Sequence, residues 1–238
     1  MGVQGRAKGT EREVEVKPAS RVWPRRVRFG RRAYRTAPPG PAESALTQTL
    51  DTVYVHADES CLGNQFQDRA SPGGAAGLVE IWKEGIWERR DYWLSEPDTT
   101  NNRMAIRSAI EVLRALTRPC SVRFVSDSQY LVNGIQSWLE MWKARGWKRK
   151  AGPIENLELW KQLDAELARH DVEAKWVRGH VGHPENEFCD FLATRAAKEQ
   201  TASGGLISSE FEAWLAGQRS KGRYADYAES GGPSDRFG

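Results

Sequence analysis

The sequence predicts an α/β fold in which a mixed β-sheet is covered by helices. Three strand-like segments, 52–57, 78–82 and 86–94, follow one another closely and indicate an antiparallel meander. Two further strand-like segments, 122–126 and 172–177, come after helical patterns, and helical crossovers favour parallel pairing. The order is three strands, a helix, a strand, two helices, a strand and a helix, which is typical of a mixed sheet between helical layers.

The first strand-like segment, 52–57, combines β-branched and aromatic residues, as strands at the centre of a sheet do. A Gly-rich loop leads into the second segment, and the turn at 83–85 precedes the third. Thr99 is expected to cap a helix that runs to about residue 116. The predicted buried face of this helix carries Ile106, Ile110, Leu113 and Leu116.

The second half of the chain alternates helical and strand-like patterns. Pro119 ends the first helical region, and a helix-loop-helix region is expected at 128–170. Pro184 is favourable at a first helical position and opens a last helix that runs to about residue 199. Beyond residue 201 the chain is rich in Gly and Ser, with one short amphipathic piece at 211–215, so we expect a mostly flexible tail.

Length and composition favour one domain. The 238 residues, 39% of them apolar, can bury one substantial core, which we assign to residues 51–200, between a basic arm at 1–50 and the tail at 201–238. No apolar run reaches transmembrane length and the N-terminus lacks the apolar core of a secretory signal, so we expect a cytoplasmic protein that does not enter a membrane. The cysteines show no metal-binding spacing and are interpreted as reduced thiols. They are Cys61, Cys120 and Cys189.

The basic charge lies in the N-terminal arm. Residues 1–50 hold 11 lysines and arginines against 4 acidic residues, whereas the rest of the chain is acidic, so that the net charge is only +3. The arm lacks sustained periodicity and is expected to be disordered on its own. Trp23, Phe29 and Tyr34 interleave with its arginines, a pattern that suits nucleic acid. A solvated tail or an overlong start of the sequence explains the same composition equally well.

Three aspartates are predicted at positions that suit a metal site. Asp58 and Asp127 each stand where an apolar strand-like run stops, and Asp190 lies on the inner face of the last amphipathic helix. Hard oxygen ligands without Cys or His partners favour Mg²⁺ or Mn²⁺, and two such ions suit phosphodiester hydrolysis. Taken alone, Asp127 is better explained as a helix cap, because it stands before the helix-favouring SQYLV.

Five motifs then occur in order: ADESCLGN, TTNNRM, SDSQYLVNGI, the Trp/Lys/Arg-rich WLEMWKARGWKRK with NLELW after it, and WVRGHVGHPENEFCD. Over about residues 52–197 the chain therefore resembles the type 1 ribonuclease H family. The resemblance implies the ribonuclease H fold, with a mixed five-stranded sheet flanked by helices. It also implies hydrolysis of the RNA strand of RNA/DNA hybrids with two Mg²⁺ or Mn²⁺ ions.

The resemblance assigns roles to individual residues. Asp58, Asp127 and Asp190 match three of the four metal-binding carboxylates, with Asp58 bridging both ions, and His180 matches the histidine that assists proton transfer or product release. The residues that match minor-groove contacts are Asn64, Asn101, Asn102 and Gln129. Those that match the basic protrusion, which grips the DNA strand, are Trp138, Trp142, Lys143, Arg145, Trp147, Lys148, Arg149 and Lys150. Packing in the core is the alternative for Trp138 and Trp160.

The fourth carboxylate of the family is missing, because Ala105 stands where the family has Glu after the Met of the second motif. Glu59 replaces a family Gly beside Asp58. Compensation by Glu59, or less favourably by Glu187, is one explanation, although strand alternation points Glu59 away from Asp58. The second explanation is a protein that binds hybrids without cleaving them. The third is a deliberate Glu-to-Ala change. We expect a monomeric hydrolase, with a non-catalytic hybrid-binding module as the alternative.

Overall fold

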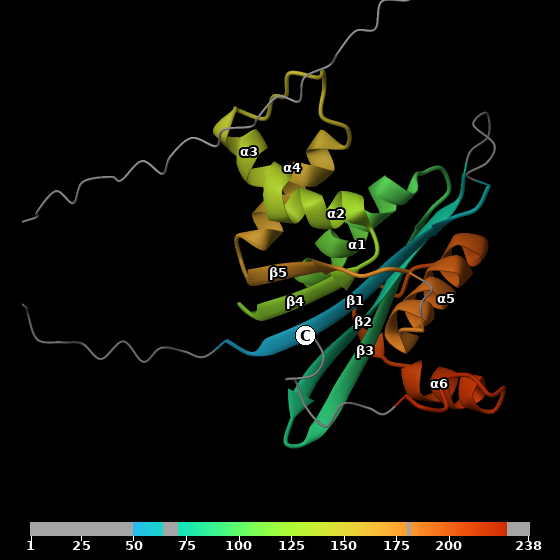
Figure 1. Ribbon diagram of the computed structural model, residues 1–238. Helices are drawn as coiled ribbons and strands as arrows, with labels where there is room; N and C mark the ends of the chain where they lie inside the picture. The colour runs from blue at the N-terminus through green and yellow to red at the C-terminus, as the bar shows by residue number, and fades with distance from the viewer. Residues whose placement is uncertain (1–49, 64–70, 180–181, 228–238) are drawn as a thin grey trace, which may run out of the picture. The chain divides into compact units, whose positions relative to one another are not determined.

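The computed structural model describes residues 50–63, 71–179 and 182–227. Its centre is a six-stranded mixed sheet with the strand order β5-β4-β1-β2-β3-β6 (Figure 1). The strands are β1 (Thr52–Cys61), β2 (Gly73–Lys83), β3 (Ile86–Glu96), β4 (Ser121–Ser126), β5 (Asp171–Trp176) and β6 (Ile207–Ser208). The first three form the predicted antiparallel meander, while β4 pairs in parallel with β1 and β5.

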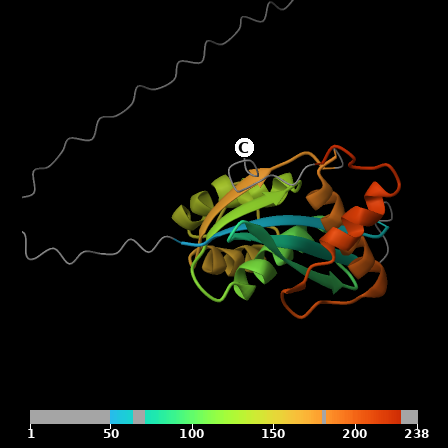
Figure 2. The same cartoon turned by 90° about the horizontal axis from the view of Figure 1, so that it is seen from below.

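Helices cover both faces of the sheet. They are α1 (Asn101–Ala115), α2 (Gln129–Asn133), the π-helical turn η1 (Gly134–Trp138), α3 (Leu139–Ala144), α4 (Leu157–Leu167), α5 (Pro184–Glu199) and α6 (Phe211–Arg219). The first five lie on one face and α5 with α6 on the other, as Figures 1 and 2 show. None of the helices in the described part of the chain is long and apolar enough to cross a membrane.

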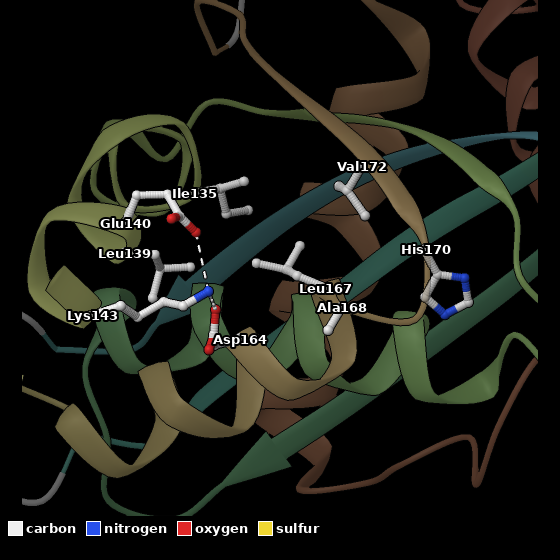
Figure 3. Close-up of a pocket in the computed structure, with 9 residues that line it drawn as sticks. All are labelled: Ile135, Leu139, Glu140, Lys143, Asp164, Leu167, Ala168, His170 and Val172. Atoms are coloured by element: carbon white, nitrogen blue, oxygen red, sulfur yellow. Dashed lines mark hydrogen bonds and ion pairs between the residues drawn. The ribbon is translucent and has the colours of Figure 1, made fainter. Parts of the chain in front are cut away.

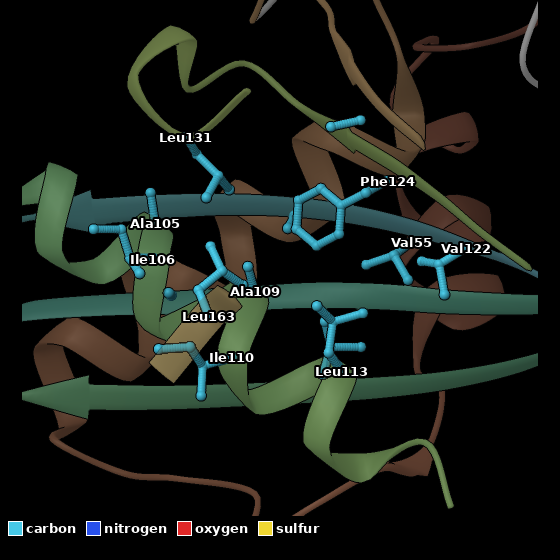
Figure 4. Packing of buried hydrophobic residues seen from close by; sticks show 14 of the residues in the cluster. Val55, Ala105, Ile106, Ala109, Ile110, Leu113, Val122, Phe124, Leu131 and Leu163 are labelled. Carbon is cyan, nitrogen blue, oxygen red and sulfur yellow. The ribbon is translucent and has the colours of Figure 1, made fainter. Parts of the chain in front are cut away.

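The core under α1 confirms the predicted buried face of that helix. Ile106, Ile110 and Leu113 are buried there (Figure 4). Leu116 is also buried and follows the helix as its C-cap. They pack against Phe124 and other apolar residues of the central strands. The helix begins one residue later than predicted, because Thr100 is its N-cap and accepts a hydrogen bond from the backbone N of Arg103 at 3.3 Å.

Close backbone contact brings α5 onto β2. A Cβ atom on Gly74 would lie 2.2 Å from the carbonyl O of Ala193 and 2.6 Å from the backbone N of Ala197. Only glycine fits between this strand and this helix, so Gly74 sets the distance of α5 from the sheet. The same helix carries Asp190, whose position relative to the strands therefore depends on this contact.

Three strands differ from the prediction. The expected Gly-rich loop before residue 78 is part of β2, which begins at Gly73. The first strand does not stop at Asp58 but continues to Cys61, because residues 58–61 keep their antiparallel partners on β2. The sixth strand, β6, was not predicted. It adds to the edge of β3, where Arg90 pairs with Ser208 and Asp91 with Ile207.

The C-terminal segment differs from the expected flexible tail. Phe211 and Leu215, the apolar residues of the predicted amphipathic piece, are buried against α5 and β2. The Asp91 carboxylate on β3 accepts hydrogen bonds from Ser209 Oγ at 2.6 Å and from the backbone N of Glu210 at 2.7 Å. The segment is ordered because it covers apolar surface that α5 leaves open and pairs with an otherwise exposed sheet edge. Residues 1–49 and 228–238 lie outside the described residues.

Candidate active site

Three carboxylates meet where β1 runs past the end of β4. One oxygen each from Asp58, Glu59 and Asp127 lies within 4.8 Å of the other two. The parallel pairing of β1 with β4 ends at Ala57 and Ser126, so Asp58 and Asp127 are the next residues on two neighbouring strands. Two neighbouring strands therefore bring Asp58 and Asp127 to one point in the structure.

Glu59 reaches this point from the opposite face of the sheet. Asp58 pairs with Ala76, which belongs to the apolar cluster under α5, whereas Glu59 pairs with Ala75, in the cluster under α1. Strand alternation holds here, as β1 continues past Asp58. It does not separate the two carboxylates, because the pairing with β4 has ended and side chains from both faces can bend around the free edge. Ala105 of α1 lies in the same cluster as Ala75.

Burial and mutual repulsion raise the pKa values of two carboxyl groups in this cluster. Burial, followed by the charges of Asp127, Glu59 and Asp190, raises the pKa of Asp58 to about 9. Burial and the charge of Asp127 raise the pKa of Glu59 to about 8, against a hydrogen bond from Ser128 that lowers it. Such a cluster has too little positive charge nearby to ionise fully. Its oxygen-only donor set fits a divalent cation such as Mg²⁺ or Mn²⁺.

Neighbouring groups orient two of the three carboxylates. Asn186, at the start of α5, donates a hydrogen bond from Nδ2 to Asp58 Oδ2 at 3.0 Å, and the backbone N of Glu59 donates to Asp58 Oδ1 at 2.7 Å. A Cβ atom on Gly179 would lie 2.2 Å from Asp127 Oδ2, so glycine lets the segment after β5 pack against that carboxylate. Sequence reasoning missed Asn186, although its place four residues before Asp190 on one helix face was a usable signal.

Asp190 and Glu187 lie outside the three-carboxylate cluster. Asp190 is half-buried on α5 and close enough for its charge to raise the pKa of Asp58, but its carboxylate is not among the three whose oxygens lie within 4.8 Å. Both residues line a groove between α5 and the C-terminal segment that contains α6. Glu187 accepts a charged hydrogen bond from Arg223, so this candidate substitute for the missing carboxylate points to the C-terminal segment instead.

Two of the predicted site residues, Asn64 and His180, lie outside the described residues. The other predicted groove contacts are at helix starts. Asn101 is half-buried and Asn102 exposed in the first turn of α1, and Gln129 is exposed as the first residue of α2.

The Trp-rich region is partly core. Trp142, predicted to contact substrate, is only 5% exposed, with its ring 5.6 Å from that of Trp160 and 5.7 Å from that of Trp138. Trp142 is buried because its side chain, on α3, packs against Trp160 of α4. The core alternative for Trp160 is confirmed, since Trp160 is fully buried. Trp147 is half-buried against the same core.

The charged residues of this region are divided between two surfaces. Lys143 bridges Asp164 at 3.0 Å and Glu140 at 3.1 Å in a pocket between α3 and α4 (Figure 3). These two carboxylates raise the pKa of Lys143. The remaining predicted cations, Arg145, Lys148, Arg149 and Lys150, are exposed and lie in or after the loop that follows α3.

The region of the chain that carries these residues is similar to known proteins. Residues 51–198 match the ribonuclease H family. The chain is 49% identical over 146 residues to ribonuclease H of Stutzerimonas stutzeri, covering 61% of this chain and 91% of that protein. It is 44% identical over 151 residues to ribonuclease HI of Pseudomonas aeruginosa, covering 63% and 95%.

A solved structure at 50% identity is that of LC9-RNase H1, described as a type 1 RNase H with the type 2 active-site motif. It superposes with a TM-score of 0.66 and covers 70% of this chain and 82% of that one. The matched region includes the three clustered carboxylates and the strands and helices that position them. This chain belongs to the ribonuclease H family.

Proposed function

We propose that this protein hydrolyses the RNA strand of RNA/DNA hybrids by using two divalent ions, Mg²⁺ or Mn²⁺. The observation that carries the proposal is the cluster of Asp58, Glu59 and Asp127, whose oxygens lie within 4.8 Å of one another at the edge of the central sheet. Family membership supports the substrate class, and the raised pKa values of Asp58 and Glu59 support a cation as the natural partner of the cluster.

Glu59 takes the place of the carboxylate that Ala105 lacks. Both residues lie on the α1 face of the sheet, so a carboxylate extended from Glu59 approaches the region that a longer side chain at position 105 would enter. LC9-RNase H1, half identical to this chain, likewise departs from the type 1 motif according to its description. The proposed ligands are therefore Asp58, Glu59 and Asp127, together with Asp190 from α5.

The residues of the chain divide the work of the reaction. Bound divalent ions would activate a water molecule and stabilise the leaving oxygen of an in-line displacement. Asp58, held by Asn186, would contact both ions, while Asp127 is kept in place by the segment at Gly179. His180 follows Gly179 directly and would carry a proton to or from the leaving group, since an imidazole titrates near neutral pH.

The hybrid would contact two groups of residues. Asn64, Asn101, Asn102 and Gln129 carry short amides that donate and accept hydrogen bonds, which suits base edges and 2′-hydroxyls in an A-like minor groove. The exposed cations after α3, Arg145 and Lys148 among them, would meet the phosphates of the DNA strand. Trp147 is accessible in part, whereas Trp142 and Lys143 would act through packing and helix stability. We propose a cytoplasmic monomer.

The test is cleavage of a labelled RNA/DNA hybrid by the full chain with Mg²⁺ or Mn²⁺, beside Asp127→Asn. Cleavage of the RNA strand that the variant lacks supports the proposal. Cleavage no faster than that of the variant, together with tight hybrid binding, would show a binding module without turnover. The absence of a carboxylate at Ala105 is the observation that favours this second candidate.

A further inference from the structure

The C-terminal segment 207–227, named here the C-terminal clamp, lies beyond the residues 51–198 that match the family. It is attached firmly at its first half. β6 pairs with β3, Asp91 accepts two hydrogen bonds from the start of α6, and Phe211 is fully buried. Arg89 of β3 also bonds Glu212 and stacks over the Phe211 ring, with its guanidinium 5.1 Å from the ring centroid. This half has a fixed position on the sheet.

After α6 the chain turns back toward the start of α5. Gly222 and Tyr224 have φ values of 77° and 54°, which reverse the chain, and the Tyr224 ring lies 5.9 Å from that of Trp214. Arg219 donates a hydrogen bond to the carbonyl O of Tyr227 at 2.6 Å and so fixes the segment that turns back after α6. These contacts place Arg223 and Tyr227 beside the first turn of α5.

Both residues form hydrogen bonds with glutamates of that turn. Arg223 donates to Glu187, and the hydroxyl of Tyr227 donates to Glu185. Glu185 is only 6% exposed, so the Tyr227 contact lies at the packed side of the turn. The Arg223 side chain is 50% exposed and pairs with the half-buried Glu187 at the rim of the same turn. Figure 1 shows α6 beside α5 on the same face of the sheet.

The residue between these glutamates is Asn186. It is 2% exposed and donates the hydrogen bond to Asp58 described above. Asp190 lies one turn further along the same helix. A shift of the first turn of α5 would therefore move Asn186 away from the carboxylate that it orients, and would move Asp190 with it.

We propose that the C-terminal clamp positions the metal-binding carboxylates, and that Arg223 and Tyr227 are its positioning residues. They act through Glu187, Glu185 and Asn186 and touch neither ions nor hybrid. The inference rests on the proposed role of Asp58 as a metal ligand. It assigns a task to a part of the chain that the family match does not include.

The test measures Mn²⁺ binding to the hybrid-free full chain by titration calorimetry, and then cleavage kinetics. Because outer partners of metal ligands contribute roughly 10- to 100-fold in affinity or activity, Arg223→Ala and Tyr227→Phe should each weaken Mn²⁺ binding, by about tenfold at most. kcat should fall while KM for the hybrid stays unchanged, since the clamp packs on the α5 face of the sheet and the described hybrid-contact candidates lie on the α1 face. Lys221→Ala, a charge removed from an exposed site in the same turn, is the matched control.

A charge reversal separates positioning from simple stability. Glu187→Arg and Arg223→Glu should each lower Mn²⁺ affinity, and the double variant should recover it by re-forming the pair. Recovery would also exclude Glu187 as a ligand. Unchanged Mn²⁺ affinity in all single variants, with or without a lower Tm, would contradict the proposed role of the clamp.

The two proposals fail in different ways. A wild-type chain that binds Mn²⁺ and loses affinity in the clamp variants, but cleaves no hybrid, would contradict the proposed function and leave the clamp standing. A wild-type chain that cleaves the hybrid with variants that match it in Mn²⁺ affinity and kcat would contradict the clamp alone. A wild-type chain that binds no Mn²⁺ at all would overturn both.

Discussion

Asn186 Nδ2 donates a hydrogen bond to Asp58 Oδ2 at 3.0 Å, and it does so across the interface between α5 and β1 in a site where both residues are buried. The other oxygen, Oδ1, accepts a hydrogen bond from the backbone N of Glu59 at 2.7 Å, so both oxygens of Asp58 are oriented by donors. An amide at this place supplies a donor without adding charge to a cluster that already has three carboxylates.

Asn186→Ala should therefore weaken the metal site. The loss of the donor frees the Asp58 carboxylate to rotate, and we expect a roughly 10- to 100-fold loss of activity or Mn²⁺ affinity, as for other partners of metal ligands. Calorimetry and single-turnover cleavage would measure it. Asn133→Ala, an exposed asparagine on α2, is the control. Wild-type Mn²⁺ affinity in Asn186→Ala would show that Asp58 needs no such support.

Glu59→Gln should abolish cleavage while the circular dichroism spectrum stays that of the wild type. It removes a ligand charge, so the loss should exceed the roughly 100-fold upper figure for outer partners. The double variant Glu59→Gln/Ala105→Glu should regain part of the activity, because both positions lie on the α1 face of the sheet. Full activity in Glu59→Gln would rule this residue out as the substitute.

The contribution of Asp58 and Glu59 to the stability of the metal-free protein should fall as pH rises from about 4 to 9. Asp58 and Glu59 have raised pKa values of about 9 and 8 in the folded chain, so over this range the folded state holds protons that the unfolded state has released. The stability that these two groups contribute is fully present below their pKa values in the unfolded state. It is lost as pH rises through their pKa values in the folded state. Urea unfolding with a chelator, at several pH values, measures the slope.

Added Mn²⁺ should reverse this dependence, because metal binding expels the same protons. Calorimetry in buffers of different ionisation enthalpy should then show proton release near pH 7. An Asp58→Asn/Glu59→Gln variant should show neither the slope nor the release. Equal slopes in that variant and the wild type would place the titrating groups elsewhere.

Gly74→Ala should destabilise the fold. Its Cβ would meet the backbone of α5 at 2.2 Å, and neither the strand nor the helix can give way cheaply. Overpacking of this kind costs roughly 1–3 kcal/mol in the free energy of unfolding. Gly217→Ala is the matched comparison, since nothing lies within 4 Å of its added Cβ in helix α6. It should be neutral or stabilising by about 0.5–1 kcal/mol. Denaturant unfolding of both variants checks the contrast.

Deletion of residues 1–50 should flatten the salt dependence of hybrid binding. If the arginines of the arm meet phosphates, each lost contact lowers the slope of log affinity against log salt by about 0.9 for a duplex. Binding titrations at several salt concentrations measure this. Identical slopes for the full and shortened chains would show that the arm does not contact the hybrid.

The sequence by itself determined the meander, the parallel pair of strands and the buried face of α1, since each depends on a local apolar period. Pro184 likewise marked the start of α5 correctly. Asp58 and Asp127 were predictable as neighbours, because each follows an apolar run and parallel strands end at one edge of a sheet. These inferences need only the order of residues along the chain.

Only the tertiary structure decided the remaining questions. Local alternation argued against Glu59, and the free edge beyond the β1–β4 pairing removed that objection. Trp142 carried a surface motif but lies in the core, and the tail folds because Phe211 fills space that α5 leaves on the sheet. Contacts between distant segments, such as Asn186 with Asp58 or Tyr227 with Glu185, depend on how the layers pack. Packing is a property of three-dimensional shape, which no local pattern of residues records.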